Sequence, residues 1–401
     1  MQRISLTARC YFFAICLSLA FCVPAKADPG AFHAFLESLW PRASAQGISR
    51  ATFTRVLDRL SEDPSVPIAV AKQPEFERLL STYFKEAVSP TRVARGRALA
   101  QTYHGELDTV VSRYGVPRGI LLAAWGMESD FGRDRGDKDI VRSLATLAFH
   151  RRDNDLFSNE LLSALVILQR GQLTRARLVG SWAGAMGDPQ FMPSAYLKYA
   201  VSYRGAGVPD IWNSPADTLA SIGYFLRASG WNPALPWGME VVLPKDFDFK
   251  TLHADFRDFA AAGVKAANGA AMPHGNATLF MPAGAGGPAF LLSENYWVLK
   301  AYNNSDSYAL SLACLGDRIE GRNGLRKAWP QHQKLWRRSE KIEIQHLLTK
   351  LGLYHGTFDG KFGQASRDAI HAFQIEARDA PADGIGGPGL LALLHAKADA
   401  R

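Results

Sequence analysis

Apolar residues recur every three or four positions along much of this chain, which is the spacing that places them on one face of a helix. The pattern runs from 31 to about 113 and again from 117 to about 173. Short apolar runs at 241–243 and 289–292 are typical of strands, and they lie in a mixed region that ends near 317. The sequence therefore predicts a mainly α protein with small β elements.

The last part of the chain has a pattern of its own. A polar and basic stretch from about 321 to 338 precedes helical periods that are separated by the turns Asp359-Gly360 and Asp383-Gly384. Such paired turns predict a small bundle of three helices. We therefore expect one domain over 28–330 and a second one over 338–398.

The first 27 residues have the composition of a secretory signal peptide. Arg3 and Arg9 precede an apolar run from 11 to 23, and Ala25-Lys26-Ala27 offers a cleavage site. The run is too short for a stable membrane span, and no later segment approaches about 20 uninterrupted apolar residues. We expect a mature protein that starts near Asp28 and lies in the periplasm.

Cysteine usage and charge refine this picture only slightly. Bulky Phe21 stands where a lipoprotein signal needs a small residue, so we expect no lipid anchor at Cys22. After removal of the signal Cys314 is the one remaining cysteine, and we expect it to be buried and inert. The formal net charge falls from +8 to +5, which suits an anionic polymer such as cell wall or nucleic acid but identifies neither.

The segment from 114 to 132 holds the first candidate for chemistry. Pro117 suits the first turn of a helix, and Gly132 suits the end of one. Glu128 then lies at the end of an apolar helix face, where partial burial and the negative end of the helix dipole would both raise its pKa. A carboxyl group of this kind can protonate a glycosidic oxygen. On this segment alone, a charge that marks where the apolar face meets water is an equally good interpretation.

A second candidate is the segment from 180 to 196, which is rich in glycine, aromatic and amide side chains. Small residues let the backbone approach a ligand, Gln190 can hold an amide or hydroxyl group, and Phe191 or Tyr196 can pack on a sugar face. A tightly packed turn between helices would explain most of the glycines equally well.

Together these segments resemble the membrane-bound lytic murein transglycosylase B family, and the tail resembles the peptidoglycan-binding domain that such enzymes often carry. The resemblance implies a lysozyme-like catalytic domain. It rests on Glu128-Ser129-Asp130-Phe131-Gly132 and on further ordered matches that cover nearly all of the mature chain. These further matches lie at 143–149, 180–196, 210–214, 230–238 and 301–305.

The resemblance assigns roles to individual residues. Glu128 falls on the catalytic acid and base, Gln190 on a saccharide-contacting residue, and Ser181 on a polar residue near the glutamate. Arg151 and Arg152 match an arginine pair suited to the carboxylates of the substrate. The tyrosines that resemble residues of the family's cleft are Tyr83, Tyr224, Tyr302 and Tyr308.

The implied reaction is a cleavage without water. Glu128 would protonate the oxygen between N-acetylmuramic acid and N-acetylglucosamine and then activate the C6 hydroxyl, which closes a 1,6-anhydro ring. The expected partner is the glycan strand of peptidoglycan, with no nucleic acid and no cofactor. Asp130, Asp134 and Asp137 keep a lysozyme-type hydrolase with two carboxyl groups as an alternative. A non-catalytic wall-binding protein is another.

We expect no metal. The ten histidines lack the spacing of a zinc site, which argues against a zinc amidase or peptidase. Relatives carry an EF-hand-like loop before the segment at 210–213, but here Arg204 and Ala206 occupy the positions of calcium ligands. The sequence therefore predicts no calcium site.

Overall fold

A computed structural model of the chain describes residues 29–66, 78–331, 335–379 and 381–400. The expected signal peptide and Cys22 lie outside these ranges. The chain divides into two compact units. The helical unit contains Thr91–Ala228 and the described residues before 67, and the sheet unit contains Ser229–Arg401 and the described residues of Pro74–Pro90. Within the described ranges, every helix is too short or too polar to cross a membrane.

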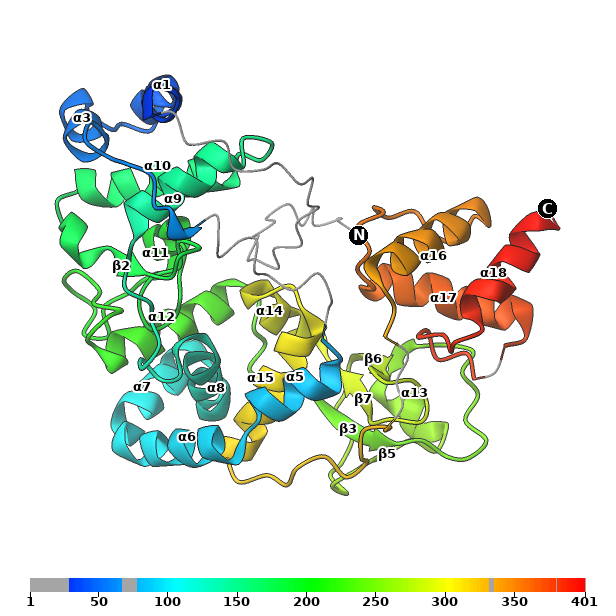
Figure 1. The fold of residues 1–401 in the computed structure, drawn as a ribbon. Helices are drawn as coiled ribbons and strands as arrows, with labels where there is room; N and C mark the ends of the chain where they lie inside the picture. Colours follow the sequence, from blue (N-terminus) through cyan, green and yellow to red (C-terminus); the bar gives the residue numbers. More distant parts are fainter. Residues whose placement is uncertain (1–28, 67–77, 332–334, 380, 401) are drawn as a thin grey trace, which may run out of the picture. The chain divides into compact units, whose positions relative to one another are not determined.

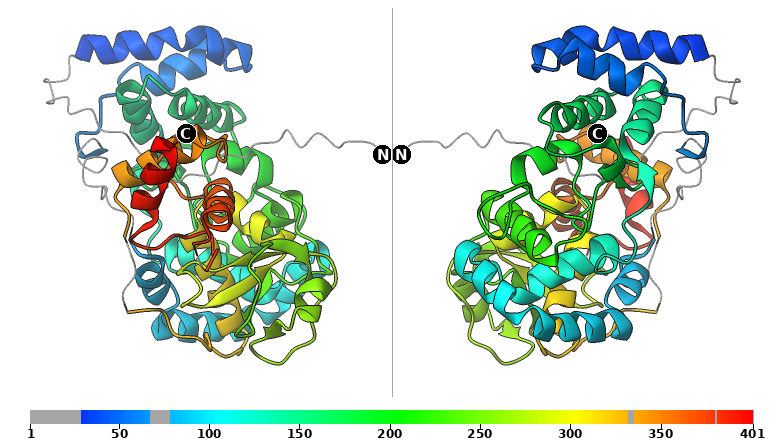
Figure 2. Two further views of the ribbon diagram at one scale, coloured as in Figure 1. Left: turned by 90° about the vertical axis from the view of Figure 1, so that its right-hand side faces the viewer. Right: turned by 90° about the vertical axis from the view of Figure 1, so that its left-hand side faces the viewer.

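The helical unit is built around α8, which packs on α7 and α12, and around the neighbouring pair α9 and α10 (Figure 1). The first helices of the chain pack on this pair, α1 on α9 and α3 on α10 (Figure 2). Two short strands, β1 and β2, pair antiparallel. The bounds are α1 (Pro29–Ser38), α2 (Trp40–Ala45), α3 (Arg50–Leu57), α6 (Pro90–Thr102), α7 (His104–Tyr114), α8 (Arg118–Ser129), β1 (Lys138–Asp139), α9 (Ile140–His150), α10 (Leu156–Gln169), the short 3₁₀ helix η1 (Arg175–Arg177), β2 (Val179–Gly180), α11 (Pro193–Tyr199) and α12 (Pro215–Ala228).

Local signals in the sequence set several of these bounds. The Asp139 side chain accepts a hydrogen bond from Arg142 N at 3.1 Å and starts α9, and Ser49 starts α3 in the same way. Gly115 ends α7 in the left-handed conformation that glycine adopts without cost. The predicted end of α8 at Gly132 was wrong by three residues, because the helix ends at Ser129 and Asp130 already turns left-handed.

The sheet unit holds a five-stranded antiparallel sheet with the strand order β4-β6-β7-β3-β5. Apolar residues of the sheet and of α13 form its core, including Leu279, Leu291 and Phe256. Beside it, α15 packs on α5 and α14 and buries Cys314, as expected. The bounds are α5 (Leu80–Ala87), β3 (Gly238–Val242), β4 (His253–Asp255), α13 (Phe256–Ala261), β5 (Lys265–Ala266), β6 (Asn276–Phe280), β7 (Ala289–Leu292), α14 (Glu294–Tyr302) and α15 (Asp306–Ile319).

The end of the chain forms the predicted bundle of three helices, α16 (Arg338–Lys350), α17 (Gln364–Ala377) and α18 (Leu390–Asp399) (Figure 1). Two of its helices use the same device to hold the turn that follows. The Gln345 side chain accepts from Gly360 N and donates to Asp359, and the Gln374 side chain accepts from Gly384 N and donates to Asp383. The bundle is therefore a short structural repeat that the sequence pattern alone did not reveal.

The second half of this repeat docks on the rest of the sheet unit. Arg367 on α17 donates to Asp306 at the start of α15 over 2.7 Å, and both side chains are largely buried. Asp368 lies 3.1 Å from His253 on β4. Asp383 accepts from Ala285 N at 3.1 Å. The bundle is thus attached to the sheet unit by a buried ion pair and by hydrogen bonds.

Candidate active site

Glu128 lies in the last turn of α8, at the end of a helix whose preceding residues are almost all buried. Gly119 to Gly126 are buried throughout, and Glu128 itself is half-buried. The predicted apolar face with Ile120 and Trp125 is present. The helix therefore delivers one carboxyl group to the boundary between the core and the surface.

An unusual turn follows this carboxyl group. Asp130, Phe131 and Gly132 all have positive φ angles, of 47°, 60° and 81°. Non-glycine residues rarely adopt this conformation, and it persists only where the surroundings enforce it. Ser129 supplies part of that enforcement, because its hydroxyl donates to Asp188 O at 2.7 Å and accepts from Gly132 N at 3.0 Å. The Phe131 ring packs so closely on Gly126 that a β-carbon there would come within 2.5 Å of it.

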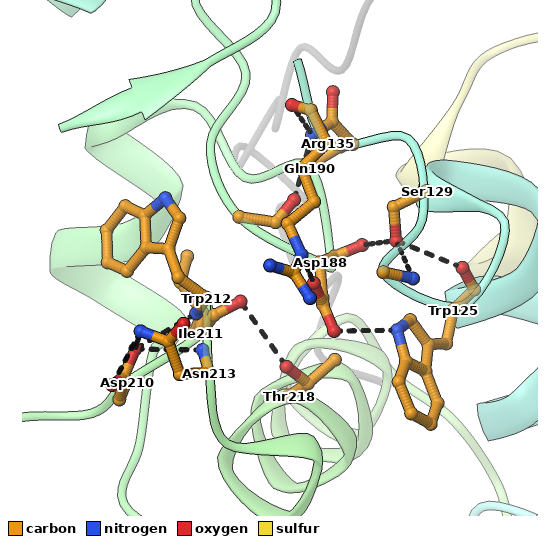
Figure 3. A network of polar contacts seen from close by, with 12 residues as sticks. Trp125, Ser129, Arg135, Asp188, Gln190, Asp210, Ile211, Trp212, Asn213 and Thr218 are labelled. Atoms are coloured by element: carbon orange, nitrogen blue, oxygen red, sulfur yellow. Dashed lines mark hydrogen bonds and ion pairs between the residues drawn. The ribbon is translucent and has the colours of Figure 1, made fainter. Parts of the chain in front are cut away.

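Asp188 joins this turn to the glycine-rich segment (Figure 3). Its side chain is 3% exposed, accepts from the Trp125 indole at 2.9 Å and forms an ion pair with Arg135. Burial raises the pKa of Asp188, although Arg135 and the indole favour the charged form. The backbone N–H of Asp188 also donates to Ile211 O at 2.8 Å. One carboxylate therefore ties α8, the turn after it and the segment near 211 to each other.

The sequence did not single out Asp188. Its position within the dense segment Gly187-Asp188-Pro189-Gln190 was the available signal. The partners Trp125 and Arg135 lie more than 50 residues away in the sequence, and only the fold brings them together.

The glycine-rich segment is a tight double turn. Ser181 N donates to Ala185 O at 2.8 Å, the Ser181 hydroxyl accepts from Ala185 N at 3.1 Å, and Met186 pairs with both Gly180 and Phe191. A β-carbon at Gly187 would come within 2.6 Å of Ile211 O. Close packing therefore accounts for the glycines, and Ser181 shapes the turn through its own hydroxyl.

Gln190 lies at the end of this turn in a left-handed conformation, with φ of 51°. Its amide nitrogen donates to Gly187 O at 2.8 Å and to Arg135 O at 3.0 Å (Figure 3). Within the described part of the chain, no hydrogen-bond donor reaches its amide oxygen. The side chain is therefore held by its N–H groups, which leaves the oxygen as an acceptor for a ligand.

Phe191 does not offer the sugar-packing face that the sequence suggested. The side chain is 0% exposed, and its ring lies 5.8 Å from that of Phe225. The same segment carries Tyr196, which is also buried and donates to Pro209 O. An aromatic ring in a glycine-rich segment can contact a ligand or pack in the core. Here both rings pack in the core.

The predicted arginine pair lies directly after α9. Arg151 contacts Asp153, and its buried Nη1 has no hydrogen-bond partner within the described ranges. The Arg152 guanidinium lies 4.2 Å from the centre of the Phe149 ring and donates to Phe149 O. Contacts with neighbouring residues thus hold both guanidinium groups. Both arginines belong to the same unit as Glu128.

The four predicted tyrosines do not form one group. Tyr224 on α12 is 36% exposed and belongs to the helical unit. Tyr83 is half-buried on α5 in the sheet unit. Tyr302 and Tyr308 are only 1% and 4% exposed and stack on each other with ring centres 6.3 Å apart. The structure thus places these last two rings in the core of the sheet unit, where little surface is left for a ligand.

The chain belongs to the transglycosylase SLT domain family, whose model matches residues 31–317. A putative peptidoglycan binding domain matches residues 337–394. These matches agree with the predicted mainly α, lysozyme-like fold and its helical C-terminal domain.

Individual relatives support the same family. The structure of SltB3 from Pseudomonas aeruginosa in complex with NAG-NAM-pentapeptide shares 40% identity, covers 90% of this chain and 99% of that chain, and has a TM-score of 0.82. Slt35 from Escherichia coli in complex with calcium shares 29% identity, with 73% and 94% covered and a TM-score of 0.60. Membrane-bound lytic murein transglycosylase B from Escherichia coli is 32% identical over 247 residues, which are 59% of this chain and 66% of that protein.

Because the Slt35 structure contains calcium, we tested whether the loop before Trp212 fits this ion. The Asp217 carboxylate accepts from Tyr203 N at 2.9 Å and from Asp210 N at 2.8 Å. Asp210 in turn accepts from Trp212 N and pairs with Arg177 at 2.8 Å. Calcium needs several oxygen ligands, and here N–H groups and a guanidinium already hold both carboxylates. These residues do not fit calcium.

Proposed function

We propose that this protein is a lytic transglycosylase that cleaves the β-1,4 bond between N-acetylmuramic acid and N-acetylglucosamine in peptidoglycan and leaves 1,6-anhydromuramoyl ends. The observation that carries the proposal is the half-buried Glu128 at the end of a buried helix, beside a turn that Ser129 and Asp188 hold in a strained conformation. The relatives with NAG-NAM-pentapeptide and NAG-anhNAM-pentapeptide, a substrate-like and a product-like ligand, support it.

In the proposed reaction Glu128 acts twice. It first gives its proton to the oxygen that leaves the muramoyl C1, while the acetamido oxygen of the same sugar stabilises the positive charge at C1. The Glu128 carboxylate then takes the proton of the C6 hydroxyl, and the C6 oxygen bonds to C1. The proton balance closes without water, so one carboxyl group is sufficient.

Three other carboxyl groups of the helical unit have structural partners. Asp130 forms ion pairs with Arg95 and Arg92, and Asp188 is held by Arg135 and Trp125. Glu160 is buried, and its two oxygens accept from Ser194 at the start of α11. A hydrolase with two acids would need a second carboxyl group that faces the substrate, and these three groups are engaged elsewhere.

The remaining predicted residues receive narrower roles. We propose that Gln190 accepts a hydrogen bond from the substrate through its amide oxygen, and that Arg151 and Arg152 bind its carboxylates. Ser181 then acts by shaping the turn near the glutamate. Tyr224 and Tyr83 keep the role of contacting the glycan, because part of each ring is accessible.

The location and the domain roles are also part of the proposal. The signal over 1–27 exports the chain to the periplasm without an anchor at Cys22. Residues 28–330 carry out the cleavage, and 338–398 hold the glycan strand and raise its local concentration.

The test is digestion of purified peptidoglycan with the wild type and with Glu128→Gln, followed by mass spectrometry of the products. The wild type should release anhydromuramoyl products, and the variant should lose activity by at least about a hundredfold, the lower part of the range for a positioned acid and base. Reducing ends that contain added water would instead identify a hydrolase.

Asp134→Asn and Asp137→Asn are matched controls, because both carboxyl groups are exposed and close to Glu128 in sequence. They should retain activity. If either control lost as much activity on peptidoglycan as Glu128→Gln, the result would favour a hydrolase with two carboxyl groups over the transglycosylase.

A further inference from the structure

The sheet unit contains a large cavity that the proposed reaction does not use. Its volume is about 1040 Å³, and it lies between the edge strand β4, the neighbouring strand β6, the start of α14 and the loop at 232–235. Cavities that bind small ligands typically measure roughly 300–1,000 Å³. This one is large enough for a disaccharide-sized ligand.

The side chains in this cavity suit a neutral sugar. Those that matter here are Asn232, His253, Asn276, Thr278, Glu294 and Trp297. Amide, hydroxyl and carboxylate groups form hydrogen bonds with sugar hydroxyl and acetamido groups, and the half-buried Trp297 offers a flat apolar surface. Lysine and arginine are absent from the described residues that line the cavity.

The absence of lysine and arginine from the described lining distinguishes between two parts of peptidoglycan as possible ligands. The peptide stems and the lactyl group of muramic acid carry carboxylates, which arginine or lysine would normally bind. Here the carboxylates in the lining are those of Asp255, which pairs with Arg257 at 3.2 Å, and Glu294, which contributes negative charge. The lining therefore favours N-acetylglucosamine over the peptide stem.

One wall of the cavity is rigid before any ligand arrives. The Asn232 side chain donates to Glu294 at 2.8 Å, and Asn232 N donates to the fully buried Asn295. The Asn295 amide also donates to Asn232 O and Leu235 O, at 2.8 and 2.7 Å. A wall held in this way loses little conformational entropy when it binds a ligand.

The opposite wall is linked to the C-terminal bundle. His253 contacts Thr278 Oγ1 through one ring nitrogen and Asp368 through the other, both at 3.1 Å. Asp368 lies on α17, within the region that matches a putative peptidoglycan binding domain. The docked bundle thus orients a side chain of the cavity.

From these observations we propose that the cavity is an accessory saccharide site that binds N-acetylglucosamine residues of a glycan strand, separate from the site of Glu128. The proposal rests on peptidoglycan as the substrate of this protein. It assigns the sheet and the docked bundle a shared role, which is to hold the strand that the helical unit cleaves.

The test uses the full chain with Glu128→Gln, which prevents turnover, and the N-acetylglucosamine tetramer as a probe in isothermal titration calorimetry. Trp297→Ala removes the apolar surface, and Asn276→Trp fills the cavity from its exposed rim. Either change should remove one class of tetramer sites and weaken binding to insoluble peptidoglycan by at least about tenfold, which corresponds to 1.4 kcal/mol. Asn268→Ala, an exposed amide outside the cavity, should change neither value.

Two outcomes would overturn the site. Unchanged binding in Asn276→Trp, which keeps Trp297 and the buried core intact, would show that the cavity is not used. Displacement of the tetramer from the Trp297-dependent class by the free pentapeptide stem would show that the ligand class is wrong. Failure of the proposed function is distinguishable, because it would appear as missing anhydro products from the wild type while tetramer binding is still measurable.

Discussion

Two buried aspartates organise the two units, and they differ in how their charge is balanced. Asp188 in the helical unit pairs with one cation, Arg135, and accepts from one indole. Asp306 in the sheet unit pairs with Lys300 at 2.9 Å and Arg367 at 2.7 Å and also accepts from Tyr296. Burial alone would raise the pKa of both side chains, because it disfavours the charged form. For Asp188 burial prevails, whereas the two cations beside Asp306 outweigh it and lower its pKa to about 2.

The difference in charge compensation between Asp188 and Asp306 indicates which unit tolerates strain. A buried carboxylate with two cations and a hydroxyl donor is well compensated. It suits a permanent joint, by which we mean the contact of Asp306 with Lys300 and Arg367 that attaches the C-terminal bundle to the rest of the sheet unit. A buried carboxylate with one cation is less well compensated, and the residue that carries it, Asp188, contacts Ser129, which follows Glu128 and begins a turn with three positive φ angles. Poorly compensated charge and backbone strain often concentrate at functional sites. The joint of the C-terminal bundle and the candidate active site are therefore built on opposite principles.

The largest expected effect comes from breaking the joint. Asp306→Ala leaves Lys300 and Arg367 buried without their shared partner, so we expect the free energy of unfolding to fall by about 3–5 kcal/mol. Urea denaturation of the full chain measures this loss. The control is Asp248→Ala, which removes the exposed pair with Lys250 and should have no measurable effect. A loss at Asp306 no larger than at Asp248 would mean that the joint contributes nothing.

The next effect concerns pH. The folded pKa of Asp306 is about 2 and its usual value is 3.8, so folding favours the charged form. The stabilisation is complete above about pH 4 and is lost as the pH falls towards 2, and it amounts to about 2 kcal/mol. Asp188 has a raised pKa, so its contribution changes in the opposite direction with pH.

Comparison of the wild type with Asp306→Asn measures the Asp306 contribution. The difference between their unfolding free energies should shrink between pH 4 and pH 2. A difference that stays constant over this range would contradict the assignment of the slope to Asp306.

Much of this architecture could be predicted from residue patterns, because the signals are local. The helix that carries Glu128, the turn around 180–191 and the three C-terminal helices follow from periodicity and from glycine positions. The joint could not be predicted, since Asp306 and Arg367 are 61 residues apart and neither is unusual in its own segment. Asp188 was missed for the same reason.

Aromatic residues mark a second limit of the sequence. Phe191 was expected to contact sugar from the chemistry of its segment, and Tyr302 and Tyr308 from family resemblance, but the fold buries all three rings. The spacing of an aromatic residue does not reveal which side of a segment faces the core. Family resemblance transfers a position in the fold, whereas the exposure of a ring depends on its neighbours in this chain.

A smaller effect is expected at the active site itself. Asp188→Asn keeps an acceptor for the Trp125 indole but removes the ion pair with Arg135, whose carbonyl holds Gln190. Because the charge of Asp188 is poorly compensated, its loss should cost little stability, whereas the displaced turn should lower kcat by about tenfold. Activity on peptidoglycan and thermal unfolding, measured on the same sample, separate the two effects. A variant that unfolds far more easily with unchanged kcat would reverse this assignment.

The smallest expected effect is that of calcium, and it tests whether internal charge pairs can replace a metal. Asp217 and Asp210 are held by backbone N–H groups and by Arg177, so their oxygens are already satisfied. Calcium at 1 mM or a chelator should therefore change neither the Tm nor the activity on peptidoglycan. Asp217→Ala should lower the Tm by several degrees, because Tyr203 N and Asp210 N lose their acceptor and an unmet hydrogen bond of this kind costs about 1–3 kcal/mol. A rise in Tm with calcium in the wild type would show that the loop still binds the ion.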